Sequence, residues 1–158
     1  MFFGERGDAV RRKKAAVIAL VMLALCAVGY ALVGNPVVAL HNHQIKAALA
    51  AVEDGETVTL NGTIPFAWDR VYTVGPYTSK EEIAEIIGFD SPAIQENNVS
   101  EGMVHLLFVK DGKVTASILG LGETLGFRIE FPTVVTVEEQ APFLVSKTDG
   151  VTTLTYAE

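Results

Sequence analysis

The sequence predicts an α+β fold in which one N-terminal transmembrane helix precedes a mostly antiparallel sheet of about seven strands with about two helices. Three observations predict this arrangement. An uncharged apolar run fills residues 15–34. Short segments rich in β-branched and aromatic residues recur after residue 56, and two-residue turn signals separate several of them. One strong helix-start signal lies among these segments, at residues 79–82.

The apolar run predicts a membrane anchor. Its 20 uncharged residues would form a helix of roughly 30 Å, which is long enough to cross the hydrocarbon core of a bilayer. Arg11-Arg12-Lys13-Lys14 precede the run, so the positive-inside rule places the N-terminus in the cytoplasm. We therefore expect a basic cytoplasmic tail over residues 1–14, a single-pass signal anchor over 15–34, and an extracytoplasmic remainder at the cell membrane.

Two other ways of processing this N-terminal segment stay open. A signal peptidase would find small residues near Val37-Val38-Ala39. Leu23-Ala24-Leu25-Cys26 resembles a lipobox with Cys26 as the lipidated residue, although a small residue is usual where Leu25 stands. An uncleaved anchor fits best, because the run exceeds the 7–15 apolar residues of an ordinary signal peptide.

The chain beyond the tail is acidic. Residues 15–158 hold seven basic and 17 acidic side chains, a net charge of −10, whereas residues 1–14 carry +3. This charge repels nucleic acid, so we expect no nucleic-acid partner. We expect a juxtamembrane linker or helix over residues 35–55 and one α+β domain over 56–158. The only cysteine precedes both segments, so the domain must hold together by packing alone.

Beyond the apolar run there are two helix signals. Ile45, Leu49 and Val52 recur at helical spacing, which predicts a short helix over about residues 42–53, and a capping box begins at Ser79. The capping box predicts a helix that ends at Gly88 and buries Ile83, Ile86 and Ile87. Seven strands are expected, at residues 57–60, 66–74, 103–109, 114–119, 127–131, 143–147 and 151–156. Residues 134–137 offer one further short strand, and residues 89–102 are expected to form a loop.

Two hairpins follow from Asp-Gly turn signals. Around Asp111-Gly112, the expected register pairs Val109 with Val114, Leu107 with Ala116 and His105 with Ile118. Around Asp149-Gly150, it pairs Val145 with Leu154 and Phe143 with Tyr156. Each register gives one consistent apolar face, which is the main test of a strand alignment.

Few residues have the pattern of a catalytic or metal site. His41-Asn42-His43 suits a solvated linker better than a metal site, since nearby residues complete no ligand set. His105 lies on an apolar strand face and suits a neutral, hydrogen-bonded core position. The glycines of residues 120–126 lack the Lys-Ser/Thr ending of a phosphate loop and suit a turn between strands. We therefore expect no catalytic residue, no metal and no cofactor.

The most distinctive stretch is aromatic. On a strand, Phe66, Trp68, Arg70 and Tyr72 would share one face, with Arg70 placed between two rings for a cation–π contact. The simplest interpretation makes this stripe the aromatic core of the domain. The alternative is a binding groove, with site residues Trp68, Asp69, Arg70, Tyr72 and Tyr77.

The block from Phe66 to Tyr72, followed by Pro76-Tyr77-Thr78-Ser79 and Lys80-Glu81-Glu82-Ile83, resembles a block in uncharacterised lipoproteins and membrane-anchored proteins of Gram-positive bacteria. The similarity covers about residues 66–88. It implies a bacterial surface setting and assigns no activity and no catalytic residue.

Together these patterns predict a membrane-tethered, extracytoplasmic binding or interaction domain of unknown ligand. Its expected partners are the lipid bilayer and a protein at the cell envelope. One alternative is a hydrolase-like envelope enzyme that uses Asp69, His105 or Glu side chains. Another is an assembly or stability factor for a neighbouring membrane protein, acting through the membrane helix.

Overall fold

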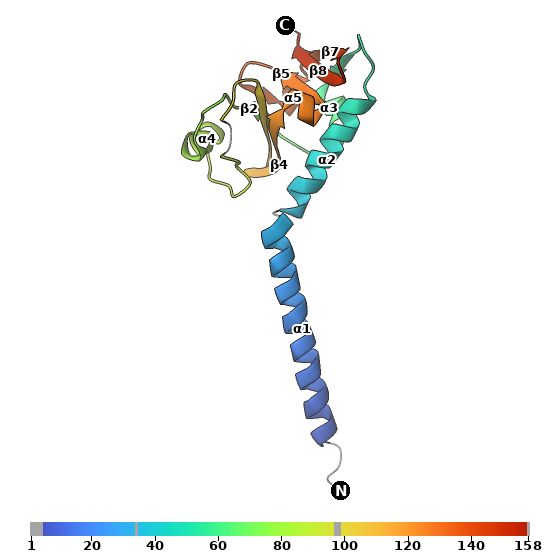
Figure 1. The fold of residues 1–158 in the computed structure, drawn as a ribbon, viewed down its shortest axis with the longest axis vertical. Coiled ribbons are helices and arrows are strands. Elements are labelled where there is room, and N and C mark those ends of the chain that lie inside the picture. Colours follow the sequence, from blue (N-terminus) through green and yellow to red (C-terminus); the bar gives the residue numbers. More distant parts are fainter. Residues whose placement is uncertain (1–4, 34, 97–98, 158) are drawn as a thin grey trace. The chain divides into compact units, whose positions relative to one another are not determined.

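The computed structural model describes residues 5–33, 35–96 and 99–157. For residues 5–10 and 30–33 it describes the backbone only. The chain divides into two compact units, residues 1–36 and 37–158. The first unit contains helix α1 (Glu5–Val33). The second is α+β: its described part holds eight strands in two four-stranded sheets, together with helices α2 to α5 (Figure 1).

The predicted membrane anchor is wrong. Among the described residues, none of the helices combines the length and the apolar character that crossing a membrane requires. Residues 11–14 of α1 are all charged, and Gly34, the last residue of the predicted span 15–34, lies outside the described residues. The same finding overturns the predicted single-pass signal-anchor topology. It also overturns the predicted localisation at the cell membrane with an extracytoplasmic domain. Cys26 is exposed on α1.

Helix α2 (Pro36–Ala51) begins earlier than the sequence predicts and belongs to the folded domain. A proline suits the first position of a helix, where its missing N–H has no intrahelical partner anyway. Ile45 and Leu49 are fully buried in the main core, as their helical spacing predicts. The segment 35–55, for which the sequence predicts a linker or helix, is therefore mostly helix.

The first sheet has the strand order β1-β7-β8-β5. Its strands are β1 (Thr57–Thr59), β7 (Pro142–Thr148), β8 (Val151–Tyr156) and β5 (Phe127–Glu130). The predicted hairpin around Asp149-Gly150 is confirmed, with Val145 opposite Leu154 and Phe143 opposite Tyr156. Strand β5 pairs with β8 in parallel, which no local turn signal can predict.

The second sheet has the strand order β4-β3-β2-β6. Its strands are β4 (Lys113–Leu121), β3 (Met103–Lys110), β2 (Arg70–Thr73) and β6 (Val134–Thr136). Val109 faces Val114 as predicted, but the register shifts between Phe108 and Val109. Beyond this irregularity Leu107 faces Ser117 and His105 faces Leu119, so two of the three predicted pairs are wrong by one residue.

A single sheet of about seven strands with about two helices is therefore wrong. After β5 the chain leaves the first sheet and enters the second as β6, and the N–H of Thr73 donates to the carbonyl of Thr133 in the connection (3.0 Å). The short helices α3 (Leu60–Thr63) and α5 (Gly122–Leu125) were also missed. One helical turn is too short to give a periodic pattern.

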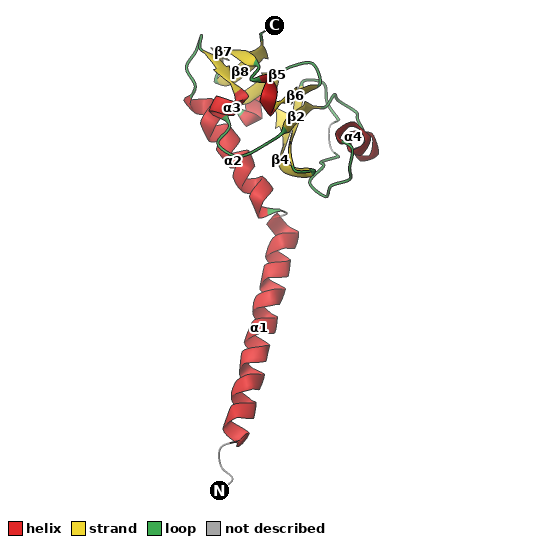
Figure 2. Ribbon diagram, turned by 180° about the vertical axis from the view of Figure 1, so that it is seen from behind, coloured by secondary structure: helices red, strands yellow, loops and turns green. Residues whose placement is uncertain are grey.

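Two apolar clusters hold the domain together. The inter-sheet core takes residues from both sheets and from α2, among them Phe108, Phe127 and Phe143. The second cluster lies on the other face of the β4-β3-β2-β6 sheet, under helix α4 (Lys80–Ile87). Figure 2 shows α4 on the opposite side of this sheet from α2.

Helix α4 forms as its capping box predicts. The Ser79 hydroxyl accepts from the N–H of Glu82 (3.2 Å), and the Glu82 carboxylate accepts from the N–H of Ser79 (2.8 Å). Gly88 ends the helix with φ +89°, a conformation that glycine adopts without strain. Ile83 and Ile87 are buried, but Ile86 is 45% exposed, so its predicted burial is wrong.

Candidate functional site

The aromatic stripe does not form one surface. Trp68 is buried in the inter-sheet core, Tyr72 in the cluster under α4, and Arg70 is exposed. The period-two pattern fails because β2 starts only at Arg70. Immediately before it, the N–H of Asp69 donates to the carbonyl of Val109 (2.7 Å). No shared binding face for Trp68, Arg70 and Tyr72 results.

Asp69 clamps the turn between β3 and β4. Its carboxylate accepts from Lys110 Nζ (2.5 Å) and from the N–H of Asp111 (2.8 Å). The bond from Lys110 is the larger cause, and the bond from the N–H of Asp111 the second, of a pKa of Asp69 below its usual value. The bond between Lys110 and Asp69 in turn raises the pKa of Lys110. Asp111 and Gly112 both have positive φ, so the clamp fixes a tight hairpin turn.

His41 and Asn42 protect the outer edge of β4. The Asn42 amide donates to the carbonyl of Ser117 (2.7 Å) and accepts from its N–H (3.0 Å), as a neighbouring strand would. The Nδ1 of His41 is 2.8 Å from the carbonyl of Thr115, and its ring stacks on Phe66. The solvated-linker interpretation of these residues is therefore corrected: they shield an open strand edge.

Asn42→Ala is expected to lower the free energy of unfolding by about 1–3 kcal/mol, because the N–H of the buried Ser117 loses its partner. Urea unfolding of the full chain measures the loss. His43→Ala is the matched control, since His43 is exposed on the same helix, and it should stay within about 0.5 kcal/mol of the wild type. Equal losses in the two variants would contradict the edge-protecting role.

His105 is sealed inside the domain. Its side chain is 1% exposed, and neither ring nitrogen has a hydrogen-bond partner. The hydrogen-bonded core position expected from the sequence is thus corrected to an unpartnered one. Burial lowers the pKa of the imidazole from 6.5 to about 4, so the ring is neutral near pH 7. A general base needs access to substrate and an orienting partner, and His105 lacks both.

The glycine-rich segment 120–126 forms the short helix α5 between β4 and β5. Gly126 has φ +82°, and a Cβ on Gly122 would overlap the Arg128 side chain. Arg128 therefore crosses over Gly122 and pairs with the carboxylate of Glu123 (2.5 Å). The one-turn helix α5 thus connects β4 to β5, and Gly122 leaves room for the side chain of Arg128.

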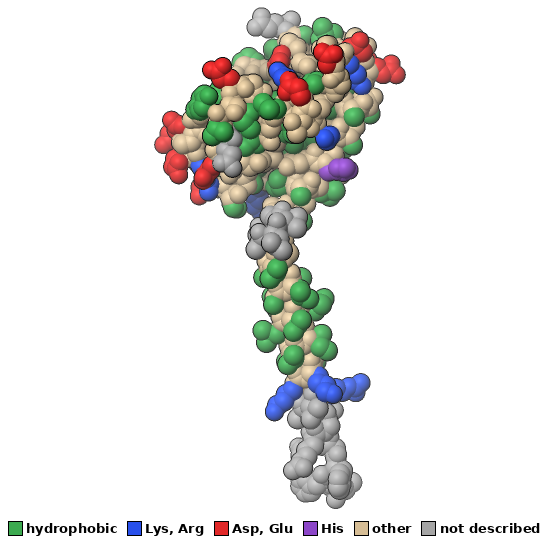
Figure 3. Space-filling model, viewed as in Figure 1, with side chains coloured by type: hydrophobic (Ala, Val, Ile, Leu, Met, Phe, Trp, Pro, Cys, Tyr) green, Lys and Arg blue, Asp and Glu red, His purple; other side chains and the backbone are tan. Residues whose placement is uncertain are grey.

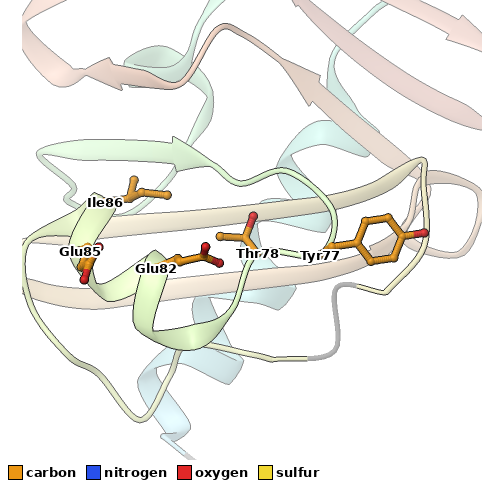
Figure 4. Close-up of a pocket in the computed structure, with 5 residues that line it drawn as sticks. All are labelled: Tyr77, Thr78, Glu82, Glu85 and Ile86. Atoms are coloured by element: carbon orange, nitrogen blue, oxygen red, sulfur yellow. The ribbon is translucent and has the colours of Figure 1, made fainter.

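The first candidate surface is a shallow hollow of about 580 Å³, here called the Tyr77 hollow. It is lined by Tyr77, Thr78, Glu82, Glu85 and Ile86 (Figure 4). Glu82, Glu85 and Ile86 project from α4, while the Tyr77 ring extends away from the helix in this view. Tyr77 is 67% exposed and has φ +63°, a left-handed conformation that bulky residues rarely adopt.

The second candidate surface is a groove of about 290 Å³ beside β5, here called the β5 groove. One wall holds Thr73 and residues 102–104, and the other holds residues 128–131. Acidic side chains are spread over the face of the domain in Figure 3. Among the described residues, no group of three or more His, Cys, Asp or Glu side chains has the geometry of a metal site.

Of the predicted binding residues, Tyr77 lines the first of these two surfaces. The sequence did not predict Glu82, Glu85 and Ile86 as site residues. Their position shortly after Pro76-Tyr77 in the chain was a signal that could have identified them. The β5 groove joins segments about 25 to 55 residues apart, so no local pattern could have found it.

Comparison of the chain with protein-family models, with curated proteins and with solved structures gave no match. The resemblance of residues 66–88 to a block in Gram-positive surface proteins therefore stays a prediction.

Proposed function

We propose that residues 37–158 form a protein-binding domain and that the Tyr77 hollow is its contact surface. One observation carries this proposal: a largely exposed tyrosine on a left-handed backbone. A non-glycine residue held there costs of order 1–3 kcal/mol. Because the residue is 67% exposed, little packing within the domain offsets that strain.

The surroundings of Tyr77 suit a protein partner. Tyrosine is among the residues that contribute most to binding energy at protein interfaces. Ile86 adds exposed apolar area, and Glu82 and Glu85 add carboxylates. The pKa of Glu82 is lowered by its bonds to Ser79, first through the backbone N–H, so this carboxylate stays ionised. We infer a partner segment that places an apolar side chain beside a lysine or arginine.

The other hypotheses lack such support. Of the side chains named for a hydrolase, His105 is buried without a partner and Asp69 is clamped, and the Glu side chains were not singled out by position. The assembly-factor hypothesis required a helix that crosses a membrane, so we do not pursue it.

Tyr77→Gly is expected to separate stability from binding. Glycine relieves the left-handed strain, so the free energy of unfolding should stay equal or rise by up to about 1 kcal/mol. Contact with the partner should be lost. Asp149→Gly is the matched control, because Asp149 also has a positive φ (51°) and lies in the β7–β8 turn, away from the hollow.

Binding is measured with a photo-crosslinking amino acid placed at Ile86, which lines the hollow and is 45% exposed, or, for comparison, at the exposed Leu144 of β7, in cells that make the full chain with Tyr77, with Tyr77→Gly or with Asp149→Gly. We expect a discrete adduct from position 86 that Tyr77→Gly abolishes and Asp149→Gly keeps, with none from position 144. Loss of stability in Tyr77→Gly, or equal adducts from both positions, would overturn the proposal.

A further inference from the structure

One face of the β4-β3-β2-β6 sheet is covered by an excursion of the chain. The chain leaves β2 after Thr73 and returns as β3 at Met103, and β2 and β3 are neighbours in the sheet. Residues 76–96 of this excursion are here called the α4 cover. Gly75 and Gly102 stand at its two ends, and small loop residues at such places absorb the backbone rotation of a hinge. Because both ends attach to adjacent strands, the cover can swing out without breaking the β2–β3 pair.

Apolar packing holds the α4 cover on the sheet. Its buried apolar side chains are Ile83, Ile87 and Ile94. The ion pair between Lys80 and Asp90 (3.7 Å) joins two parts of the cover to each other. Gln95 reaches the sheet, where its Nε2 donates to the carbonyl (3.0 Å) and to the hydroxyl (3.1 Å) of Ser117. The inter-sheet core, as described, includes no residue of the cover, so opening of the cover leaves that core in place.

His105 lies under this cover. Along β3, Leu106 and Phe108 belong to the inter-sheet core and Leu107 to the cluster under α4. Because successive side chains of a strand point to opposite faces, the side chain of His105 points to the α4 side. It is 1% exposed, and neither ring nitrogen has a hydrogen-bond partner. A proton on this ring would be a buried, unpaired charge, which is costly until the cover opens and admits water.

None of the described charged groups around His105 compensates such a charge. In the sheet its neighbours are Val74 of the β2 side and Leu119 of β4. Tyr72, the titratable member of the cluster under α4, is uncharged in acid. Lys80 pairs with Asp90. The acidic residues on and just beyond the cover are exposed to solvent: Glu81, Glu82, Glu85, Asp90, Glu96 and Glu101. Burial alone lowers the pKa of His105 to about 4.

We propose that the α4 cover is an acid-operated switch, which opens away from the β4-β3-β2-β6 sheet in mild acid as His105 gains a proton, while both sheets stay folded. All five residues that line the Tyr77 hollow belong to the cover, so opening takes the hollow apart. The loss of partner binding in acid rests on the proposed function. The opening itself does not, because it is measured on the chain alone.

Hydrogen exchange of the ¹⁵N-labelled full chain, at pH 7 and at pH 5, measures how often the cover opens. His105 has a pKa near 6.5 when exposed and about 4 under the cover, so the open fraction should rise about 20-fold between these pH values. We expect this rise, after correction for intrinsic exchange, at the N–H groups of Ile83 and Gly88, which are bonded within the cover. The N–H of Val145, bonded to the carbonyl of Glu56, should stay far better protected at both pH values. The range ends at pH 5 because ordinary carboxylates titrate below it.

His105→Leu and His105→Gln remove the titration, and the glutamine variant serves where leucine disturbs the cover. In either one the α4 amides should open equally at the two pH values, whereas His43→Ala, which removes an exposed imidazole, should follow the wild type. The proposal is overturned if the open fraction of α4 does not rise in acid, or if the rise persists in both His105 variants. It is equally overturned if Val145 opens as often as α4, because the whole domain would then unfold. Absence of an adduct from position 86 would overturn the protein-binding function and leave the switch standing.

Discussion

Trp68→Ala is expected to lower the free energy of unfolding by about 3–5 kcal/mol, as large-to-small aromatic changes in cores do. The indole is 4% exposed and meets the ring of Phe108 edge-on, with 6.0 Å between ring centroids. Because Phe108 comes from the central strand β3 and is fully buried, the cavity would open within the inter-sheet core. A domain of ordinary stability has only about 5–15 kcal/mol in total.

Urea unfolding of the full chain tests this expectation. Trp68 is the only tryptophan, so the variant loses the usual fluorescence signal, and circular dichroism must follow the transition. Leu144→Ala is the control, since Leu144 is 50% exposed on β7 and should change stability by about 0.5 kcal/mol or less. A loss below about 1 kcal/mol for Trp68→Ala would contradict its place in the core.

Local chemistry explains what the sequence predicts well. The β7–β8 hairpin and helix α4 depend on residues within a few positions of one another: a turn at Asp149-Gly150 and a capping box at Ser79. Such signals are complete in a short stretch of chain. The same holds for Val109 and Val114 next to the Asp111-Gly112 turn. The predicted register of the β3–β4 hairpin fails only beyond the irregularity between Phe108 and Val109.

The failures have a common cause in tertiary structure. The split into two sheets depends on where the chain crosses between β5 and β6, and the parallel β5–β8 pair joins strands about 25 residues apart. Residues 41 and 42 look like linker because their partners, Thr115 and Ser117, are 74 and 75 residues away. Apolar periodicity shows that a residue is buried, but does not identify the element that covers it.

The candidate site shows the same division. The sequence predicted Tyr77 as a binding residue because it closely follows the aromatic residues of 66–72, and Tyr77 lines a surface hollow. The stripe interpretation of Trp68, Arg70 and Tyr72 failed because it assumed a continuous strand, whereas Asp69 bonds to the neighbouring strand outside the β2 ladder. The two walls of the β5 groove meet only in the folded domain.

Acidification is expected to destabilise the domain through His105. Its pKa is about 4 in the folded chain and near 6.5 when exposed. Between these values the unfolded chain binds a proton that the folded chain excludes, so stability falls as the pH drops from 6.5 to 4 and is unaffected by this group above 6.5. One pKa unit corresponds to about 1.4 kcal/mol, so the full loss is roughly 3 kcal/mol.

His105→Leu isolates this contribution. Leucine cannot titrate and leaves no unpartnered N–H in the apolar surroundings, so the variant should be at least as stable as the wild type at pH 7. Its advantage should then grow by roughly 3 kcal/mol as urea unfolding is repeated from pH 7 down to pH 4. Carboxylates titrate alike in both proteins and cancel in the difference. His43→Ala, which removes an exposed imidazole, should follow the wild type at every pH. A constant difference between His105→Leu and wild type would show that His105 gains a proton as readily in the folded chain as in the unfolded one.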